Sequence, residues 1–271
     1  MLAERMRVLI TVKAAPEPSK KYIDTVCVAG VRLDQPEPSW IRLYPVPFRH
    51  LSGEQKYAKY QIIDVDVNPA KSDDRHESRR PVWDSVELVG KPATSLARVP
   101  ALLPLTGPTM CELQAGVAAD LRAQSLGLVR VRALTSVAIE PHPGWTPAQI
   151  QAMTAHLEQP ELLGDVDEVP PLVAPRLVVR YAYTCMTPEC AGHRQRILDW
   201  ELAALQHRFR HVTVDALEAV IREKFEAGKF SEPVLTYLFV GNFAHPAKRR
   251  NFAVLGVWTT PRATETRVTL F

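Results

Sequence analysis

The chain has 271 residues, of which 46% are hydrophobic and 23% are charged. This composition is that of a folded domain, and it excludes a disordered, collagen-like or coiled-coil chain. The 33 basic and 30 acidic side chains leave a net charge of +3, which alone does not indicate a nucleic-acid partner. Residues 175–271 are the basic part, with 14 basic and 9 acidic side chains. No apolar run approaches the ~18 residues of a membrane span, and the first residues lack a signal-peptide pattern, so we expect a cytoplasmic protein without a membrane partner.

Short β-strands are predicted throughout the first 90 residues. Segments that alternate apolar and polar residues, rich in β-branched side chains, are typical of strands. They lie at Arg7–Lys13, Asp24–Val31, Trp40–Tyr44, Tyr60–Val67 and Ser85–Val89. Such short strands, separated by Pro, Asp and Ser, favour a small barrel or sandwich over a parallel sheet with crossover helices, and a barrel of the oligonucleotide-binding (OB) type is the natural candidate. We therefore predict an OB-like domain at residues 1–90.

A mixed segment is predicted at residues 91–175. The charged stretch just before it, residues 68–81, has no periodicity and is expected to be an exposed loop. Within the mixed segment we expect a helix near Met110–Gln124 and strands at Leu128–Leu134 and Val137–Glu140. A second helix is expected at Thr146–Leu157, where Thr precedes a Pro in the first helical position. Residues 158–175 are acidic and contain prolines, as in a linker.

A second β unit with inserted helices is predicted at residues 176–271. Strands are expected at Leu177–Thr184, Val234–Val240 and Phe252–Trp258. Apolar residues at three- and four-residue spacings predict amphipathic helices at Gly192–Phe209 and Asp215–Glu226. The expected fold class is therefore α+β: an OB-like barrel followed by a mixed unit with a helix pair and antiparallel strands.

A C-x4-C-x2-H pattern is the most informative spacing in the chain. Cys185, Cys190 and His193 offer two thiolates and an imidazole, which are good zinc ligands. The alternative is that both cysteines are small buried hydrophobes and that His193 merely begins a helix. A fourth ligand is open among Asp199, Glu201, His207, His211, Cys27 and Cys111, or a water. An open position would make the zinc catalytic, and a filled one would make it structural.

Two groups of residues are candidates for nucleic-acid binding. Trp40, Arg42 and Tyr44 alternate along one strand and so share a face on which bases could stack, with Arg49 extending the positive charge. The second group, Lys248-Arg249-Arg250, lies in a hairpin connection and suits phosphate contacts. The alternatives are ordinary packing of the aromatics and a basic turn that serves solubility. The run from Asp73 to Arg80 has the composition of an acid–base site, but it is expected to be an ordinary charged loop.

Several short strings together resemble the bacterial dual OB-fold domain proteins. They are Val26-Cys27-Val28-Ala29-Gly30, Trp40-Ile41-Arg42-Leu43-Tyr44-Pro45, Arg75 with Glu77-Ser78-Arg79-Arg80-Pro81, Cys190-Ala191-Gly192-His193, Asp199-Trp200-Glu201, Gly241-Asn242 and Gly256-Val257-Trp258. The resemblance implies two OB-like units, nucleic-acid binding, a gene neighbourhood concerned with antiviral defence and an effector protein partner.

The favoured hypothesis is a non-enzymatic accessory protein that binds nucleic acid, either DNA or RNA. In this hypothesis a zinc ion stabilises the helical element that follows Cys185. One alternative is a zinc-dependent nuclease or hydrolase, with Asp199 or Glu201 as the general base. The other is an interaction scaffold whose exposed aromatic and arginine side chains contact a partner protein.

Overall fold

The computed structural model describes residues 3–18, 26–49, 56–71, 73–157 and 172–262. Five strands of the first part close into a barrel, in the order β1-β2-β3-β5-β4. They are β1 (Glu4–Lys13), β2 (Val26–Arg32), β3 (Ser39–Val46), β4 (Ile62–Pro69) and β5 (Ser78–Val89). Pairing between β1 and β4 closes the barrel, and β3 and β5 run parallel while the other pairs are antiparallel.

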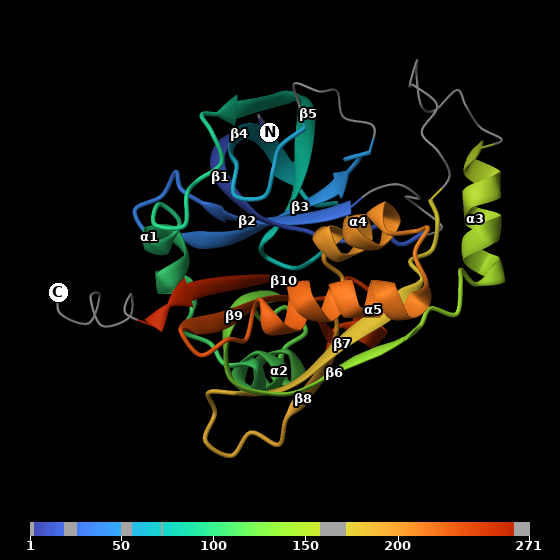
Figure 1. Ribbon diagram of the computed structural model, residues 1–271. Coiled ribbons are helices and arrows are strands. Elements are labelled where there is room, and N and C mark those ends of the chain that lie inside the picture. The colour runs from blue at the N-terminus through green and yellow to red at the C-terminus, as the bar shows by residue number, and fades with distance from the viewer. Residues whose placement is uncertain (1–2, 19–25, 50–55, 72, 158–171, 263–271) are drawn as a thin grey trace.

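A second five-stranded sheet follows, in the order β10-β9-β6-β7-β8. Its strands are β6 (Leu126–Pro141), β7 (Leu177–Cys185), β8 (His193–Arg196), β9 (Val234–Asn242) and β10 (Phe252–Pro261). The long strand β6 pairs with both β7 and β9, and a parallel bridge between Ile197 and Val254 joins the end of β8 to β10. In Figure 1 this sheet lies below the first barrel.

The two units share one strand connectivity. In each, the first strand pairs with the second and fourth, the second with the third, the fourth with the fifth, and the third runs parallel to the fifth. This is the five-stranded, partly open Greek-key arrangement of OB barrels. The expected α+β class, with an OB-like barrel followed by a mixed unit of antiparallel strands and helices, is thereby confirmed, and the second sheet follows the strand connectivity of the first barrel.

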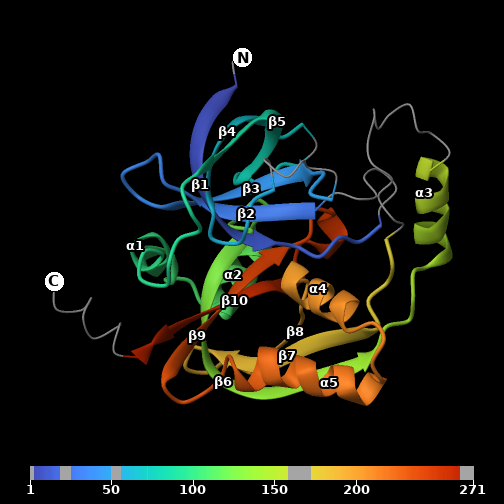
Figure 2. The same cartoon turned by 45° about the horizontal axis from the view of Figure 1, so that its top comes forward.

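Helices fill the connections. Short turns at α1 (Val99–Leu102) and η1 (Leu103–Leu105) lead from the barrel to α2 (Met110–Ala119), while α3 (Pro147–Leu157) stands apart at the side of the molecule in both Figures 1 and 2. Between β8 and β9 lie α4 (Trp200–Arg208), α5 (Val214–Arg222) and the π-helical turn η3 (Glu223–Ala227), and the turn η4 (Pro246–Lys248) joins β9 to β10. Among the described residues, no helix combines the length and apolar character that crossing a membrane requires.

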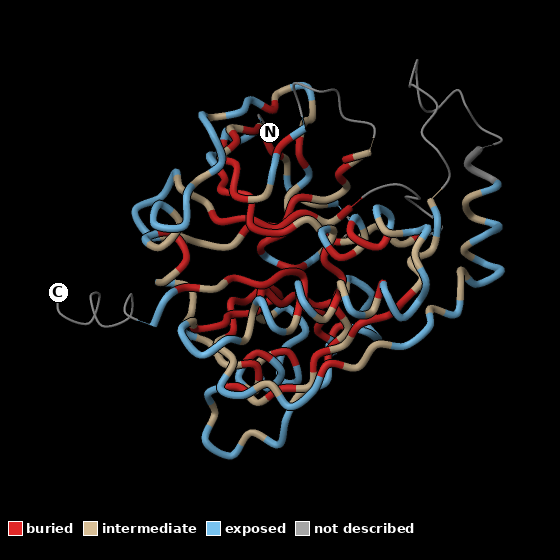
Figure 3. Tube along the Cα trace, in the orientation of Figure 1, coloured by how far each residue is buried: buried red, intermediate tan, exposed pale blue. Residues whose placement is uncertain are grey.

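Three apolar cores hold the molecule together. One fills the first barrel, around Val8, Ile41 and Leu43, as the alternation in β3 predicts. Another lies between the second sheet and α2, α4 and α5. The third core joins the two units: apolar residues on the outer face of β1–β2–β3 pack against β6, β9 and β10. Figure 3 shows buried segments on both sides of this seam between the units.

Three local expectations were wrong. Residues 193–196 form strand β8, not the first turn of a helix, because they pair with β7 from Arg180 to Tyr183. The two strands expected within 128–140 are one bent strand, β6, with register shifts on its β7 side. The charged loop 68–81 is not simply exposed, because β5 begins at Ser78 and the side chains of Arg75 and Glu77 are buried. The first part of the 158–175 linker, residues 158–171, lies outside the described residues.

Candidate metal centre and nucleic-acid surfaces

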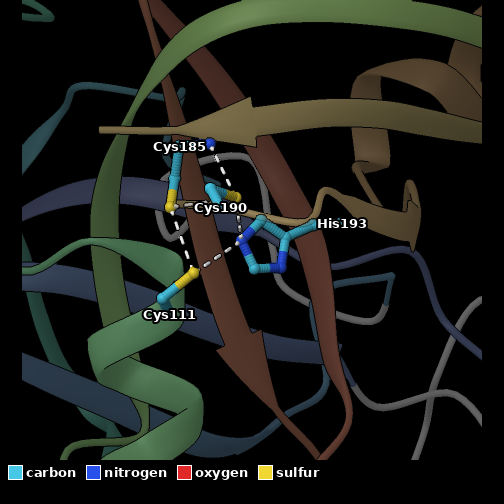
Figure 4. Close-up of side chains that lie close together, drawn as sticks. All are labelled: Cys111, Cys185, Cys190 and His193. Carbon is cyan, nitrogen blue, oxygen red and sulfur yellow. Dashed lines mark hydrogen bonds between the residues drawn. The ribbon is translucent and has the colours of Figure 1, made fainter. Parts of the chain in front are cut away.

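Three cysteines and one histidine converge between α2 and the β7–β8 connection. Cys185 ends β7, Cys190 lies in the turn, and His193 begins β8, so a hairpin between paired strands brings the C-x4-C-x2-H ligands together. The fourth residue is Cys111, near the beginning of α2. In Figure 4 the four side chains point toward one another.

The spacing of the four ligand atoms fits a tetrahedral zinc ion. All four lie within 4.8 Å of one another. Cys185 Sγ is 3.6 Å from the Sγ atoms of Cys111 and Cys190, and His193 Nε2 is 3.2 Å from Cys190 Sγ and 3.4 Å from Cys111 Sγ. Zinc–ligand bonds of about 2.3 Å to sulfur and about 2.0 Å to nitrogen give tetrahedron edges of about 3.8 and 3.5 Å. The donor set Cys3His therefore fits zinc, and the sulfurs are too far apart for a disulfide.

The electrostatics of the cluster favour one thiolate before any metal enters. Burial opposes ionisation of Cys185, but hydrogen bonds from Thr187 and the backbone outweigh it and lower the Cys185 pKa to about 5. Burial and the neighbouring sulfurs raise the pKa of Cys111 to about 11. A metal ion must therefore displace a proton from Cys111, and zinc affinity should rise with pH.

Helix α2 is held in place for this role by its own cap. Thr109 accepts from the Glu112 amide, and the Glu112 carboxylate accepts from the Thr109 amide, which forms a capping box. Thr187 Oγ1, beside Cys185 in the facing turn, lies 2.9 Å from Thr109 Oγ1. Cys111 was only one of six candidates in the sequence, because nothing local to it predicts that α2 packs on the β7–β8 turn.

The predicted stacking face of β3 lies in the seam between the units. Ile41 and Leu43 point into the barrel core as expected. On the other side, Trp40 contacts Phe239 of β9 edge-on, with 6.2 Å between ring centroids. Arg42 is only 2% exposed and donates to Cys27 Sγ and to the hydroxyl and carbonyl oxygens of Ser125. The expectation that Arg42 contacts nucleic acid is therefore wrong, because the second unit takes up its guanidinium.

In the basic connection between β9 and β10, one arginine is likewise buried while its two neighbours are exposed. Arg249 is 3% exposed and pairs with Asp74 of the first unit at 2.9 Å, while it also donates to the carbonyls of Leu121 and Ala244. Its predicted phosphate contact is wrong, because these protein groups take up its guanidinium. Lys248 and Arg250 are exposed, and Tyr44 and Arg49 are half-buried, so these four residues stay predictions.

The charged run from Asp73 to Arg80 forms the polar centre of the seam. Arg75 donates to the side chain of Asp73 and to the backbone carbonyl of Asn242 at 2.7 Å. Glu77 accepts from the amide of Ser125 at 2.7 Å and from its hydroxyl at 2.9 Å. The loops that join the fourth and fifth strands of the two units therefore contact each other, and the expectation of an ordinary charged loop was wrong.

Asp199 and Glu201, the alternative catalytic residues, lie at another part of the seam. Asp199 caps α4 by accepting from the Glu201 amide, and Lys59 Nζ lies 3.7 Å from Asp199 and 3.4 Å from Glu201. A Cβ atom on Gly256 would come within 3.1 Å of Lys59 Nζ, so the glycine leaves room for this ion pair. Burial raises the pKa of Asp199, which Lys59 opposes. These contacts give both carboxylates a structural partner.

A cavity of about 410 Å³ opens beside Trp40. Its polar lining includes Arg32 at the end of β2, Trp40 in β3, and His76, Glu77 and Arg79 around the beginning of β5. Pro104, Pro108 and Gln124 close it from the side of the second unit. Arg79 donates to the backbone carbonyls of His76 and Ser78, and Arg32 pairs with Glu4 and Asp34.

Two stacked barrels of OB connectivity, with a Cys3His cluster at one hairpin, define the class of this protein. Residues 106–271 match the family described as domain of unknown function DUF8757, and the chain belongs to that family. Residues 4–102 match a second such description, DUF8758. No curated protein matches the chain.

Two solved structures are similar over most of the chain at low identity. One is a murine DNA-binding protein bound to double-stranded DNA, at 9% identity and a TM-score of 0.29, with 95% of this chain and 94% of that chain covered. The other is a replication protein A heterotrimer bound to single-stranded DNA, at 10% identity and a TM-score of 0.34, with 99% and 51% covered. The strand connectivity of the two units defines the fold of this chain.

Proposed function

We propose that this protein binds nucleic acid without chemical turnover and that a structural zinc ion stabilises its second barrel. The observation that carries the proposal is the cavity beside Trp40, where an indole lies among the side chains of Arg32, His76 and Arg79. A volume of about 410 Å³ is within the range of small-ligand pockets. An aromatic surface for a base and guanidinium groups for phosphate are the elements of single-strand recognition.

The position of this cavity in the barrel also supports nucleic-acid binding, by analogy with other OB barrels. OB barrels bind oligonucleotides through their second and third strands and the loop between the fourth and fifth. Trp40 belongs to the third strand of the first barrel, and His76 belongs to the loop that precedes its fifth. Arg79 donates to carbonyl oxygens and so keeps its full positive charge for a phosphate.

Zinc at Cys111, Cys185, Cys190 and His193 is the second part of the proposal. Four protein ligands fill a tetrahedral site, which is typical of structural zinc, whereas a catalytic zinc keeps one position for water. When bound, the ion would neutralise the thiolates and tie α2 to the β7–β8 hairpin. The hydrolase alternative lacks such an open position, and Asp199 and Glu201 contact Lys59 instead.

Fluorescence anisotropy with labelled single-stranded DNA, RNA and duplex DNA tests the binding. We expect a dissociation constant on the order of 10 μM or tighter at low salt. Arg79→Ala should weaken binding about fivefold, because one charge-assisted phosphate contact of about 1 kcal/mol is lost. The matched control is Arg80→Ala, which removes the exposed neighbouring arginine outside the cavity. Absence of binding to all three probes would contradict the proposed function.

The defence role, the effector partner and the cytoplasmic location stay predictions. The scaffold alternative predicts tight binding to a protein and none to nucleic acid, so the same titrations distinguish it.

A further inference from the structure

The outer face of the first three strands is covered in the first barrel. Its side chains Leu9, Ala29 and Val31 belong to the apolar core between the units, with Trp40 packed against that core. The covering residues come from β6, β9 and β10 of the second unit. In this arrangement, the face of β1, β2 and β3 in the first unit packs against the side of the second unit formed by β6, β9 and β10.

This stacking leaves the corresponding face of the second barrel open. That face is made by β6, β7 and β8. In β7 the side chains alternate: Tyr181 and Tyr183 are buried in the core of the second unit, while Arg180, Ala182 and Thr184 are half-buried and point away from it. This face is apolar in the first barrel, where the second unit covers it. The corresponding face is polar in the second barrel, where the described residues leave it uncovered.

Four arginines gather on this open face. Strand register places Arg180 opposite Arg196 of β8, and Ala182 opposite Arg194. Arg132 of β6 reaches toward the other end of β7, with its guanidinium 3.5 Å from the Thr184 hydroxyl. The side chains of Arg194, Arg196 and Arg180 are 61%, 33% and 31% exposed. We call Arg132, Arg180, Arg194 and Arg196 the arginine face.

Small residues separate these arginines. The β6 residues across from Ala182 and Arg180 are Ser136 and Ala138. A sheet surface of alanine, serine and threonine between guanidinium groups lets a strand of nucleic acid approach the sheet closely.

Carboxylates neutralise the face only in part. Glu140 pairs with both Arg180 and Arg194, at 2.9 Å for the latter, and Glu17 pairs with Arg196 at 2.7 Å. Arg132 donates to the carbonyl of Pro188. Within the part of the chain that the structure describes, four cations thus face two carboxylates, and a phosphate that replaces Glu140 would meet two guanidinium groups already held side by side.

We infer that the arginine face is a second surface that contacts the nucleic-acid backbone; this inference rests on the proposed function and adds phosphate contacts on β6, β7 and β8 to those of the cavity beside Trp40. The tyrosines of β7 point into the core, so this face offers no aromatic platform for bases. Binding there is electrostatic and indifferent to base sequence, and it weakens steeply with salt.

The test compares the full-length protein with the double variant Arg194→Gln/Arg196→Gln, using a fluorescein-labelled oligothymidylate of about 20 nucleotides. Anisotropy titrations over a salt series give both affinity and its salt dependence. We expect binding at least about tenfold weaker, and a slope of log affinity against log salt that is smaller by about 1.4, since each single-strand phosphate contact contributes about 0.7.

Two further variants make the result specific to this face. Glu140→Gln releases Arg180 and Arg194 and should tighten binding about threefold. The control Arg5→Gln/Arg7→Gln removes two arginines of the first barrel that are 40% and 51% exposed and are also paired with carboxylates. This control should bind as the unchanged protein does, and circular dichroism should show all variants folded.

An unchanged affinity of the Arg194/Arg196 variant, with the parent protein binding normally, overturns this inference and leaves the proposed function standing. Equal losses in the Arg5/Arg7 control would also overturn it, because the effect would then reflect net charge. If the parent protein binds no strand of any kind, the proposed function falls, and the inference with it.

Discussion

Buried charged side chains at the seam depend on one another for hydrogen bonds and ion pairs. Ser125 illustrates this: its hydroxyl donates to Glu77 and accepts from Arg42, while its amide also donates to Glu77. A buried charge without a partner costs several kcal/mol, so each of these residues depends on the others. Removal of one of these side chains should therefore destabilise the protein by more than the free energy of its own hydrogen bonds, because its buried partners are left without theirs.

Asp73 gives this network a pH dependence. Burial raises the pKa of its carboxyl, but the Arg75 guanidinium and the Ser78 hydroxyl outweigh this effect and lower the pKa to about 2 from 3.8. A folded-state pKa below the unfolded one adds stability above about pH 4, and this stability is lost as the pH falls toward 2. Asp73→Asn should lower the free energy of unfolding by about 2 kcal/mol at pH 7.

Urea unfolding of Asp73→Asn and of the unchanged protein between pH 7 and pH 2 measures this difference. It should shrink toward zero at the acid end of the range. The control is Asp84→Asn, which alters an exposed carboxylate of β5. A difference for Asp73→Asn that stays constant down to pH 2 would argue against the ion pair as its source.

At the scale of elements, a short helix and a hairpin share the metal centre. Helix α2 contributes only Cys111, while β7, the following turn and β8 contribute the rest. Strand β8 is four residues long and lies at the edge of its sheet. Such a short edge strand gains little from its own hydrogen bonds, so the zinc ion is expected to stabilise it.

Metal analysis by mass spectrometry should find one zinc ion per chain. Cys111→Ser should lose the zinc ion as completely as Cys190→Ser does. The unfolding temperature of both variants should fall by roughly 10 °C, because zinc binding contributes several kcal/mol to folding. Cys27→Ser is the matched control, since Cys27 lies beside Arg42 and outside the cluster. Full zinc content in Cys111→Ser would exclude Cys111 as the fourth ligand.

At the scale of the whole molecule, the apolar core between the units predicts one cooperative unfolding transition. Seventeen buried residues from both units form this core. Ala29→Asp would place an unpaired carboxylate there, at a cost of about 3–5 kcal/mol. Calorimetry should then show a lower unfolding temperature and a transition that broadens or divides in two.

Ala133→Asp, on the exposed surface of β6, serves as the comparison and should leave the transition single. Two separate transitions in the unchanged protein would show that the units fold independently and that the seam contributes little.

The sequence by itself determined most of the strands and the class of the first barrel. Alternating apolar residues predicted β3, β7 and β9 within one or two residues and β1 except for its first three, because in each strand one side chain in two enters a core. The C-x4-C-x2-H spacing predicted three of the four ligand candidates, because a hairpin brings its own residues together. The capping threonine predicted α3 at Thr146–Leu157, and that helix is present as Pro147–Leu157.

Only the tertiary structure decided the rest. Cys111 reaches the cluster through packing of α2 on a hairpin more than 70 residues away in sequence, which no local pattern encodes. The sequence context of Arg42 and Arg249 predicts surface cations, but packing of the two units against each other buries both. Residues 193–196 fit a helical pattern, but pairing with β7 makes them a strand. Alternation specifies which side chains share a face of a strand, but which face stays open depends on how two barrels stack, and that depends on contacts distant in sequence.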